Sequence, residues 1–240
     1  MNYVNCNKED LEKEYAALVA EYEEVKGKGL KLNMARGKPG EDQLNLSRPL
    51  LDVINSSTDC ITAHGADCRN YGELAGIDEC KNFFAEIFDV DPSDVMVGGN
   101  SSLNMMFDTI AGFMTKPVVE GCKPWYEVKN RKFLCPAPGY DRHFAITEYF
   151  DFDLIPVPMT ENGPDMDVVE KLVENDDSIK GIWCVPKYSN PQGITYSDET
   201  VKRFANLNPK AKDFRIFWDD AYCVHDVTET PDKLISLMDE

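Results

Sequence analysis

Two carboxylates and a phenol follow a short apolar run near the end of the chain. The run 215–218 is typical of a strand covered on both faces, and Asp219, Asp220 and Tyr222 come directly after it. Negative charge at the end of a buried strand is costly unless something there uses it. In open α/β sheets the carboxyl ends of the strands are where ligands bind. Taken alone, this stretch favours a simpler interpretation, in which Asp219 caps a turn or helix.

A second candidate site is the segment 98–102, Gly-Gly-Asn-Ser-Ser, which precedes an expected helix. Glycines allow backbone N–H groups to approach an anion, serines add hydroxyl donors, and the helix presents its positive end. The segment is neither a P-loop nor a G-x-G-x-x-G motif. Its alternative interpretation is a glycine turn with a serine N-cap. The residues that could hold a phosphate are Asn100, Ser101 and Ser102.

Two further residues follow expected strands. Tyr140 comes after Pro-Gly and could lay its ring on a flat ligand, although such a tyrosine is more often part of a core. Asn190 precedes Pro191, which favours an extended backbone that can direct the amide into a crevice. An ordinary turn is the alternative for Asn190.

The elements that must position these residues alternate along the chain. This alternation predicts an α/β fold with a mostly parallel sheet flanked by helices. The expected strands are 95–97, 132–135, 154–158, 181–185 and 215–218. The expected helices are 8–26, with Asn7 as N-cap and one apolar stripe, 50–54, 77–88, 103–114, 141–149, 165–174 and 197–206.

Composition excludes several classes of protein. A formal net charge of −18 disfavours binding to nucleic acid or to an anionic membrane. No apolar run is long enough to span a bilayer, and the polar segment 1–14 does not resemble a signal peptide. The eight cysteines contain no C-x-x-C pair and the three histidines show no ligand spacing, so no metal site is expected. We expect reduced thiols in a cytoplasmic protein.

Six motifs in order resemble the class I, aspartate-aminotransferase-like members of the fold type I pyridoxal-phosphate enzymes. They are Ala-Arg-Gly-Lys-Pro at 35–39, a Tyr-x-x-x-x-Gly turn beginning at Tyr71, the Gly-Gly-x-Ser-Ser loop, Pro-x-Pro-Gly-Tyr ending at Tyr140, Asn-Pro-x-Gly from Asn190, and Asp-x-Ala-Tyr ending at Tyr222. Gln192 stands where threonine is commoner in that family.

The resemblance implies pyridoxal 5′-phosphate as cofactor and assigns roles to the matching positions. Asn100, Ser101 and Ser102 would hold the phosphate, and Tyr140 would lie against the ring. Asn190 and Tyr222 would donate to the ring oxygen. Asp219 would keep the pyridine nitrogen protonated. Tyr71 would reach the phosphate in the neighbouring subunit of a homodimer, and Gly37 would approach the substrate carboxylate. Asp220 matches no ligand.

The function implied is transfer of an amino group between an amino acid, with an aspartate-like donor favoured, and a 2-oxo acid. Residues 1–48 would belong to the family's small domain and 49–240 to the cofactor-binding large domain. Three alternatives stay open: β-elimination on the same cofactor, a non-catalytic sensor domain, and a dinucleotide-binding domain. The last two are disfavoured, since neither a basic helix-turn-helix stretch nor a G-x-G-x-x-G motif is present.

The resemblance also implies a Schiff-base lysine a few dozen residues after the Asp-x-x-Tyr motif, and none of the 240 residues matches it. Lys233 is expected on the exposed side of a helix start near 231–238, and Lys187 is interpreted as structural or exposed. We therefore expect the sequence to be an N-terminal portion of a longer enzyme that does not catalyse alone.

Overall fold

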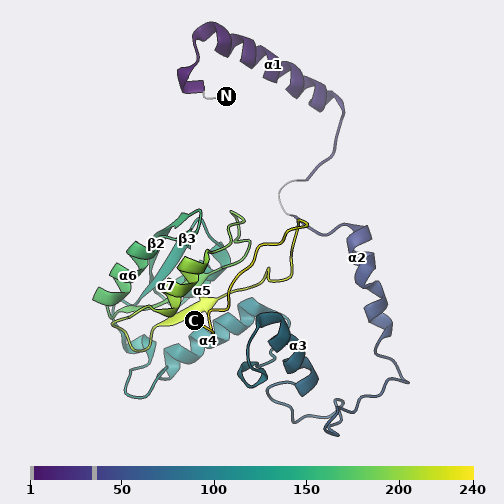
Figure 1. Ribbon diagram of the computed structural model, residues 1–240, viewed down its shortest axis with the longest axis vertical. Helices are drawn as coiled ribbons and strands as arrows, with labels where there is room; N and C mark the ends of the chain where they lie inside the picture. The colour runs from purple at the N-terminus through teal and green to yellow at the C-terminus, as the bar shows by residue number, and fades with distance from the viewer. Residues whose placement is uncertain (1–2, 34–36) are drawn as a thin grey trace. The chain divides into compact units, whose positions relative to one another are not determined.

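The computed structural model describes residues 3–33 and 37–240, and it divides into two compact units, Met1–Asp59 and Cys60–Glu240 (Figure 1). The division falls after Asp59, whereas the predicted domain boundary lies between residues 48 and 49. Within the described residues, no helix combines the length and apolar character needed to cross a membrane.

The first unit contains two helices. Helix α1, Lys8–Gly27, confirms the predicted helix, and the side chain of Asn7 caps it by accepting a hydrogen bond from the Asp10 backbone N–H at 2.9 Å. None of its residues is buried. Helix α2, Glu41–Ser47, is followed by the 3₁₀ helix η2, Arg48–Asp52. The short helix predicted at 50–54 is therefore found two residues earlier, as a 3₁₀ helix, because Pro49 places its start there.

The second unit is built on a five-stranded sheet with the order β3-β2-β1-β4-β5. Strands β1, β2, β4 and β5 are parallel, and the short β3 pairs with β2 in the antiparallel sense. This confirms the predicted fold class. The strands are β1 (Lys132–Ala137), β2 (Asp153–Thr160), β3 (Gly163–Pro164), β4 (Ile179–Cys184) and β5 (Arg215–Trp218).

Helices cover both faces of the sheet (Figure 1). The predicted helices of this unit are confirmed as α3 (Asp78–Phe88), α4 (Ser102–Thr115), α5 (Asp141–Tyr149), α6 (Met166–Asn175) and α7 (Asp198–Ala205). Single 3₁₀ turns form at η3 (Pro92–Asp94) and η4 (Trp125–Glu127), and η1 (Tyr3–Asn5) lies in the first unit.

Two hydrophobic clusters fill the space on either side of the sheet. Consecutive strand residues alternate between them, as the period of a strand requires: Phe133 packs with α4 and α5, and Leu134 packs with α6 and α7. Both side chains are fully buried. The helices α5 and α7, which follow β1 and β4, therefore lie on opposite faces of the sheet.

An ion pair is buried at the start of β4. Lys180 Nζ lies 2.8 Å from Oδ1 of Asp213, and the Trp125 indole N–H donates to Oδ2 of the same carboxylate at 2.9 Å. Every charged or polar group in this cluster has a partner, which is the condition under which a buried ion pair is tolerated.

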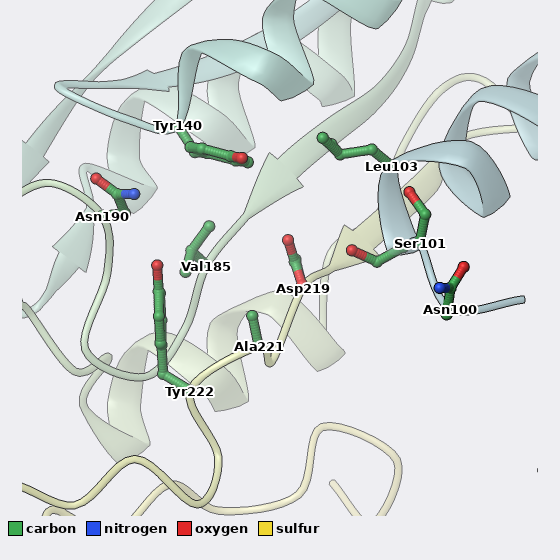
Figure 2. A pocket seen from close by; sticks show the side chains of 10 residues that line it. Asn100, Ser101, Leu103, Tyr140, Val185, Asn190, Asp219, Ala221 and Tyr222 are labelled. Atoms are coloured by element: carbon green, nitrogen blue, oxygen red, sulfur yellow. The ribbon is translucent and has the colours of Figure 1, made fainter. Parts of the chain in front are cut away.

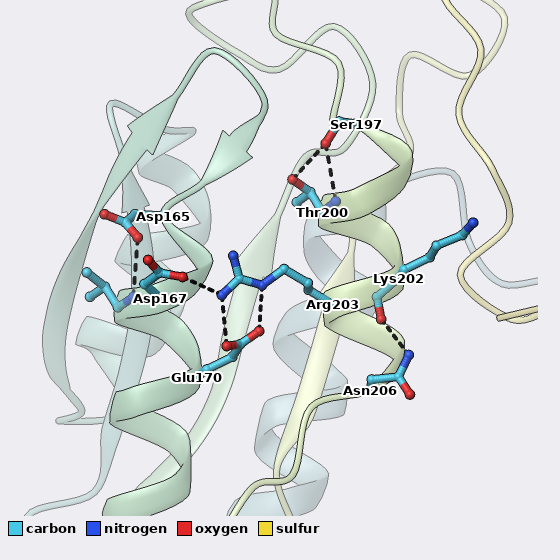
Figure 3. Close-up of polar contacts among 9 residues, drawn as sticks. Asp165, Asp167, Glu170, Ser197, Thr200, Lys202, Arg203 and Asn206 are labelled. Carbon is cyan, nitrogen blue, oxygen red and sulfur yellow. Dashed lines mark hydrogen bonds and ion pairs between the residues drawn. The ribbon is translucent and has the colours of Figure 1, made fainter.

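A half-buried salt bridge joins α6 to α7 (Figure 3). The guanidinium of Arg203 contacts Glu170 with two hydrogen bonds, at 2.7 and 2.8 Å, and Asp167 with one at 2.6 Å. The hydrogen bond from Arg203 lowers the pKa of Glu170. This salt bridge fixes α7 beside α6, and both helices pack on the same face of the sheet.

Two sequence predictions fail in this unit. Residues 95–97 are extended but form no strand in the part of the chain that the structure describes, because their one backbone ladder contact is from the Val97 N–H to the Ala75 oxygen at 2.9 Å. The segment 231–238, where the start of a helix was expected, is irregular. Leu234, Ile235 and Leu237 pack against the core from this irregular segment. Lys233 is exposed, as predicted.

Candidate functional site

A cavity of about 320 Å³ opens at the carboxyl edge of the sheet (Figure 2). It lies where β1 and β4 are neighbours and the chain leaves them in opposite directions, toward α5 and α7, so it occupies the switch point of the fold. Its walls come from the start of α4 and from the loops after β1, β4 and β5. The lining residues are Asn100, Ser101, Ser102, Leu103, Tyr140, Val185, Asn190, Asp219, Ala221 and Tyr222.

The structure brings most of the predicted site residues together. In Figure 2, Asn190 and Tyr222 lie on one side of the cavity and Ser101 on the other, with the Asp219 carboxylate between them. Tyr140 covers the cavity from the loop after β1. These side chains come from four separate segments of the sequence.

Two predicted site residues remain, Tyr71 in the second unit and Gly37 in the first. Tyr71 is 97% exposed. Gly37 is exposed in the first unit, and its motif neighbours 34–36 lie outside the described residues.

The serine segment forms the start of a long helix. Ser101 is the N-cap of α4, and its Oγ accepts a weak hydrogen bond from the Asn104 backbone N–H at 3.4 Å. Because α4 begins at Ser102, the positive end of its dipole and its free N–H groups face the cavity wall. This end of the cavity therefore favours an anionic group.

Tyr140 depends on a tight turn after β1. A Cβ at Gly139 would overlap the backbone oxygen of Pro136, so only glycine fits this close approach. The turn delivers Tyr140 as the N-cap residue of α5, with its ring against the cavity. Asn190 is placed by the loop after β4, in which the peptide bond to Pro191 is cis.

His143 contacts a cavity residue, and the sequence interpretation missed it. Its Nε2 lies 2.8 Å from Oδ2 of Asp219, and the ring is buried. It stacks on Trp183 with ring centroids 4.8 Å apart and meets the edge of Tyr140 at 5.0 Å. The signal available in the sequence was its spacing, three residues after Tyr140 on the first turn of α5.

The adjacent carboxylates have different surroundings. The Asp219 N–H donates to the Cys184 oxygen at 2.9 Å, which continues the β4–β5 ladder and turns the Asp219 side chain into the cavity. Asp220 does not line the cavity, and its Oδ1 is buried without a hydrogen-bond partner among the described residues. Burial raises the pKa of Asp220, and the nearby Lys187 charge opposes this effect. The Asp219 side chain therefore lies in the cavity wall beside His143, whereas the Asp220 side chain lies outside that wall and near the charge of Lys187.

Neither lysine considered above belongs to the cavity wall. Lys187 is buried, and its ammonium group donates to the Cys223 oxygen and to Oδ1 of Asp226, both at 2.9 Å. This agrees with a structural role. Lys233 lies on the surface. Within residues 3–33 and 37–240, no group of three or more His, Cys, Asp or Glu side chains could hold a metal ion.

The chemistry of the wall fits a flat ligand with an anionic group at one end. Hydroxyls and a helix N-terminus stand at that end, an aromatic ring covers the middle, and a carboxylate paired with His143 offers a negative partner for a protonated nitrogen. Asn190 and Tyr222 add hydrogen-bonding groups on the opposite side.

Comparison with known proteins agrees with this arrangement. The family model described as aspartate aminotransferase matches residues 6–239. A relative from Mycolicibacterium smegmatis is 44% identical over 230 residues, which are 95% of this chain and 54% of the relative. The aspartate aminotransferase of Corynebacterium glutamicum is 43% identical over 217 residues, covering 90% of this chain and 50% of that protein.

A solved structure extends the comparison to the fold. The crystal structure of an aspartate transaminase from Corynebacterium glutamicum superposes with a TM-score of 0.88 at 40% identity, and the match covers 98% of this chain and 55% of the other. The chain thus spans about half the length of the curated relatives it matches. Because the family model covers nearly all of the sequence and the α/β fold agrees, the chain belongs to the aspartate aminotransferase family.

Proposed function

We propose that this chain forms part of a pyridoxal-phosphate-dependent aminotransferase that moves an amino group from an aspartate-like donor to a 2-oxo acid. The observation that carries the proposal is the single cavity in which Ser101, Tyr140, Asn190, Asp219 and Tyr222 meet. The relative named aspartate aminotransferase supports the choice of donor.

The phosphate would bind at the start of α4. Asn100, Ser101 and Ser102 line this end of the cavity, and the helix offers unpaired N–H groups there. Hydrogen bonds to an anion are stronger than neutral ones, so a small number of donors is enough to anchor the group.

The ring would lie between Tyr140 and the opposite wall. Asp219 would stand beside the pyridine nitrogen and keep it protonated, and Asn190 and Tyr222 would donate to the ring oxygen. When bound, this cofactor supplies an aromatic system that accepts electrons from a carbon atom next to the substrate amine.

His143 would act on Asp219 rather than on the ligand. Its contact with Oδ2 leaves the other carboxylate oxygen available toward the cavity, and its stacking on Trp183 fixes the imidazole plane. The carboxylate is thereby held in one orientation before any ligand binds, which reduces the cost of ordering it on binding.

The remaining assignments are proposals of the same kind. Tyr71 would reach the phosphate of a partner subunit in a homodimer, and the fully exposed ring is available for that contact. Gly37 would approach the substrate carboxylate. A cytoplasmic location stays a prediction that rests on composition alone.

A β-eliminating lyase would use the same cofactor residues, so the cavity wall does not separate the two reactions. The names of the relatives favour amino transfer. The two reactions differ in their products, since transfer yields a new amino acid and elimination yields free ammonia.

The test is a titration of the purified protein with pyridoxal phosphate, followed by visible absorption and then by addition of aspartate and a 2-oxo acid. We expect saturable binding with one cofactor per chain, and accumulation of a second amino acid wherever turnover occurs. Failure to bind the cofactor would contradict the proposal. Ammonia release without a new amino acid would support the lyase.

A further inference from the structure

Lys187 joins two segments that carry cavity residues. It follows β4 on the loop that leads to Asn190, and its side chain is only 10% exposed. Both of its acceptors, the Cys223 oxygen and Oδ1 of Asp226, lie on the segment after β5 that carries Tyr222. One ammonium group therefore links the two sides of the same wall.

The neighbouring residue strengthens this link. Tyr188 OH donates to the same Oδ1 of Asp226 at 3.1 Å and accepts from the Asp232 backbone N–H at 2.9 Å. Its backbone adopts a left-handed conformation, with φ of 47°, which is unfavourable for a residue with a side chain. The contacts of its hydroxyl group help to hold this conformation.

The segment after β5 has little other structure to define it. It consists of short turns, in which the Cys223 N–H bonds to the Asp220 oxygen at 3.2 Å and the His225 N–H bonds to the Tyr222 oxygen at 3.0 Å. Val224 and Val227 are largely exposed. Because these exposed side chains add little packing to the turns, the charged contacts of Lys187 carry more of that task.

The electrostatics agree with a charged Lys187. Burial alone would lower its pKa, but the hydrogen bond to Asp226 and the charge of that carboxylate outweigh burial and raise the pKa. The same hydrogen bond lowers the pKa of Asp226. The pair is therefore ionised at neutral pH.

We propose that Lys187 is a positioning residue that clamps the turn 220–226 to the loop 185–190 and so holds Tyr222 at the cavity, on the side away from Ser101 (Figure 2). Lys187 would not contact the cofactor. It would act by holding Tyr222, whose hydroxyl group would donate to the ring oxygen of the bound cofactor. In this respect the inference rests on the proposed function, although the clamp itself exists without a ligand.

The first experiment needs no cofactor. Backbone hydrogen exchange is measured in the complete protein for Lys187→Met and for Lys187→Arg, which keeps the charge. Lys180→Met is the matched control. It also removes a buried lysine from an ion pair, but Lys180 lies within β4 and pairs with Asp213, away from the turn 220–226. We expect exchange at 222–226 to rise about tenfold or more in Lys187→Met, a smaller rise in Lys187→Arg, and no rise there in Lys180→Met.

The second experiment measures the route through Tyr222. A double-mutant cycle combines Lys187→Met with Tyr222→Phe, and the affinity for pyridoxal phosphate is measured in each variant. We expect about tenfold weaker binding in Lys187→Met, and a markedly smaller loss when Tyr222 has already been changed. Asp226→Asn removes the charged acceptor from the more exposed side and replaces Lys187→Met if that variant does not fold.

The outcomes separate the two proposals. If the unmodified protein does not bind the cofactor, the proposed function fails, while the exchange measurement still decides about the clamp. Unchanged exchange at 222–226 in Lys187→Met overturns the clamp. Additive losses in the double-mutant cycle overturn the route through Tyr222.

Discussion

Nε2 of His143 lies 2.8 Å from Oδ2 of Asp219, and this contact joins the first turn of α5 to the end of β5. The two residues are 76 positions apart in the sequence. Because the imidazole is buried and stacked on Trp183, it holds the carboxylate against one wall of the cavity. The site thus presents an ordered negative group at the place where a protonated ring nitrogen would lie.

The two adjacent aspartates are expected to respond differently to the same substitution. Asp219→Asn removes the charge that faces the cavity, so we expect pyridoxal phosphate to bind at least tenfold more weakly. Asp220→Asn is the matched control and should leave the affinity within about twofold, because Asp220 does not line the cavity. Titration followed by absorption measures both variants. A larger loss in Asp220→Asn would reverse the assignment.

Asp220 should also affect stability in a pH-dependent way. Burial raises its pKa above the usual 3.8, so folding favours the protonated carboxyl. This favourable contribution is complete below pH 3.8 and is lost as the pH rises through the higher folded-state pKa. Asp220→Asn should therefore raise Tm at pH 7, and the difference from the unmodified protein should shrink toward pH 3.8. A lower Tm at pH 7, or a gain that grows on acidification, would contradict this account.

The serines at the start of α4 are expected to bind the phosphate. Each charge-assisted hydrogen bond lost in the double variant Ser101→Ala, Ser102→Ala should cost roughly 1.5–3 kcal/mol of binding free energy. Ser197→Ala is the control, because Ser197 caps α7 by accepting from the Thr200 N–H at 3.2 Å and does not line the cavity.

The control should lose only the capping energy, about 1 kcal/mol of unfolding free energy, and no cofactor affinity. Binding by calorimetry and stability by thermal unfolding distinguish the two effects. Equal cofactor affinity in the double variant and the unmodified protein would exclude the serines as the anion site.

Tyr71 offers a test of subunit sharing. We expect the complete protein to be a homodimer at micromolar concentration by light scattering, and Tyr71→Phe to weaken phosphate binding. In a hybrid dimer of Tyr71→Phe and Asp219→Asn subunits, a tyrosine that crosses the interface leaves one site intact and one doubly impaired. If Tyr71 acts within its own subunit, both sites are impaired and no tight site is found. A stable monomer with normal cofactor affinity would also contradict subunit sharing.

The comparison of sequence and structure shows where local patterns suffice. The helices α4 to α7 were predicted from the alternation of helical and strand patterns along the chain, and Ser197 was recognised as the cap before α7. The strand β4 was predicted because a short apolar run is typical of a strand that is covered on both faces. These signals are local, so no tertiary contact was needed to find them.

The failures have two causes. Residues 95–97 have a strand-like composition but no neighbouring strand to pair with in the described chain, and a strand exists only through its partners. The turns at η2 and near Lys233 were misplaced because short helices are decided by capping and packing rather than by period.

By itself, the sequence determined the α/β class and the order of the motifs, and it selected the residues that meet in the cavity. The fold class depends on residue type and spacing along the chain, and the choice of cavity residues followed from the family resemblance that the six motifs carry. Only the tertiary structure decided that His143 supports Asp219, that Asp220 turns away, and that Lys187 links two loops. These relationships join positions far apart in the chain, and their geometry is set by the packing of β4, β5 and α5 around a shared core.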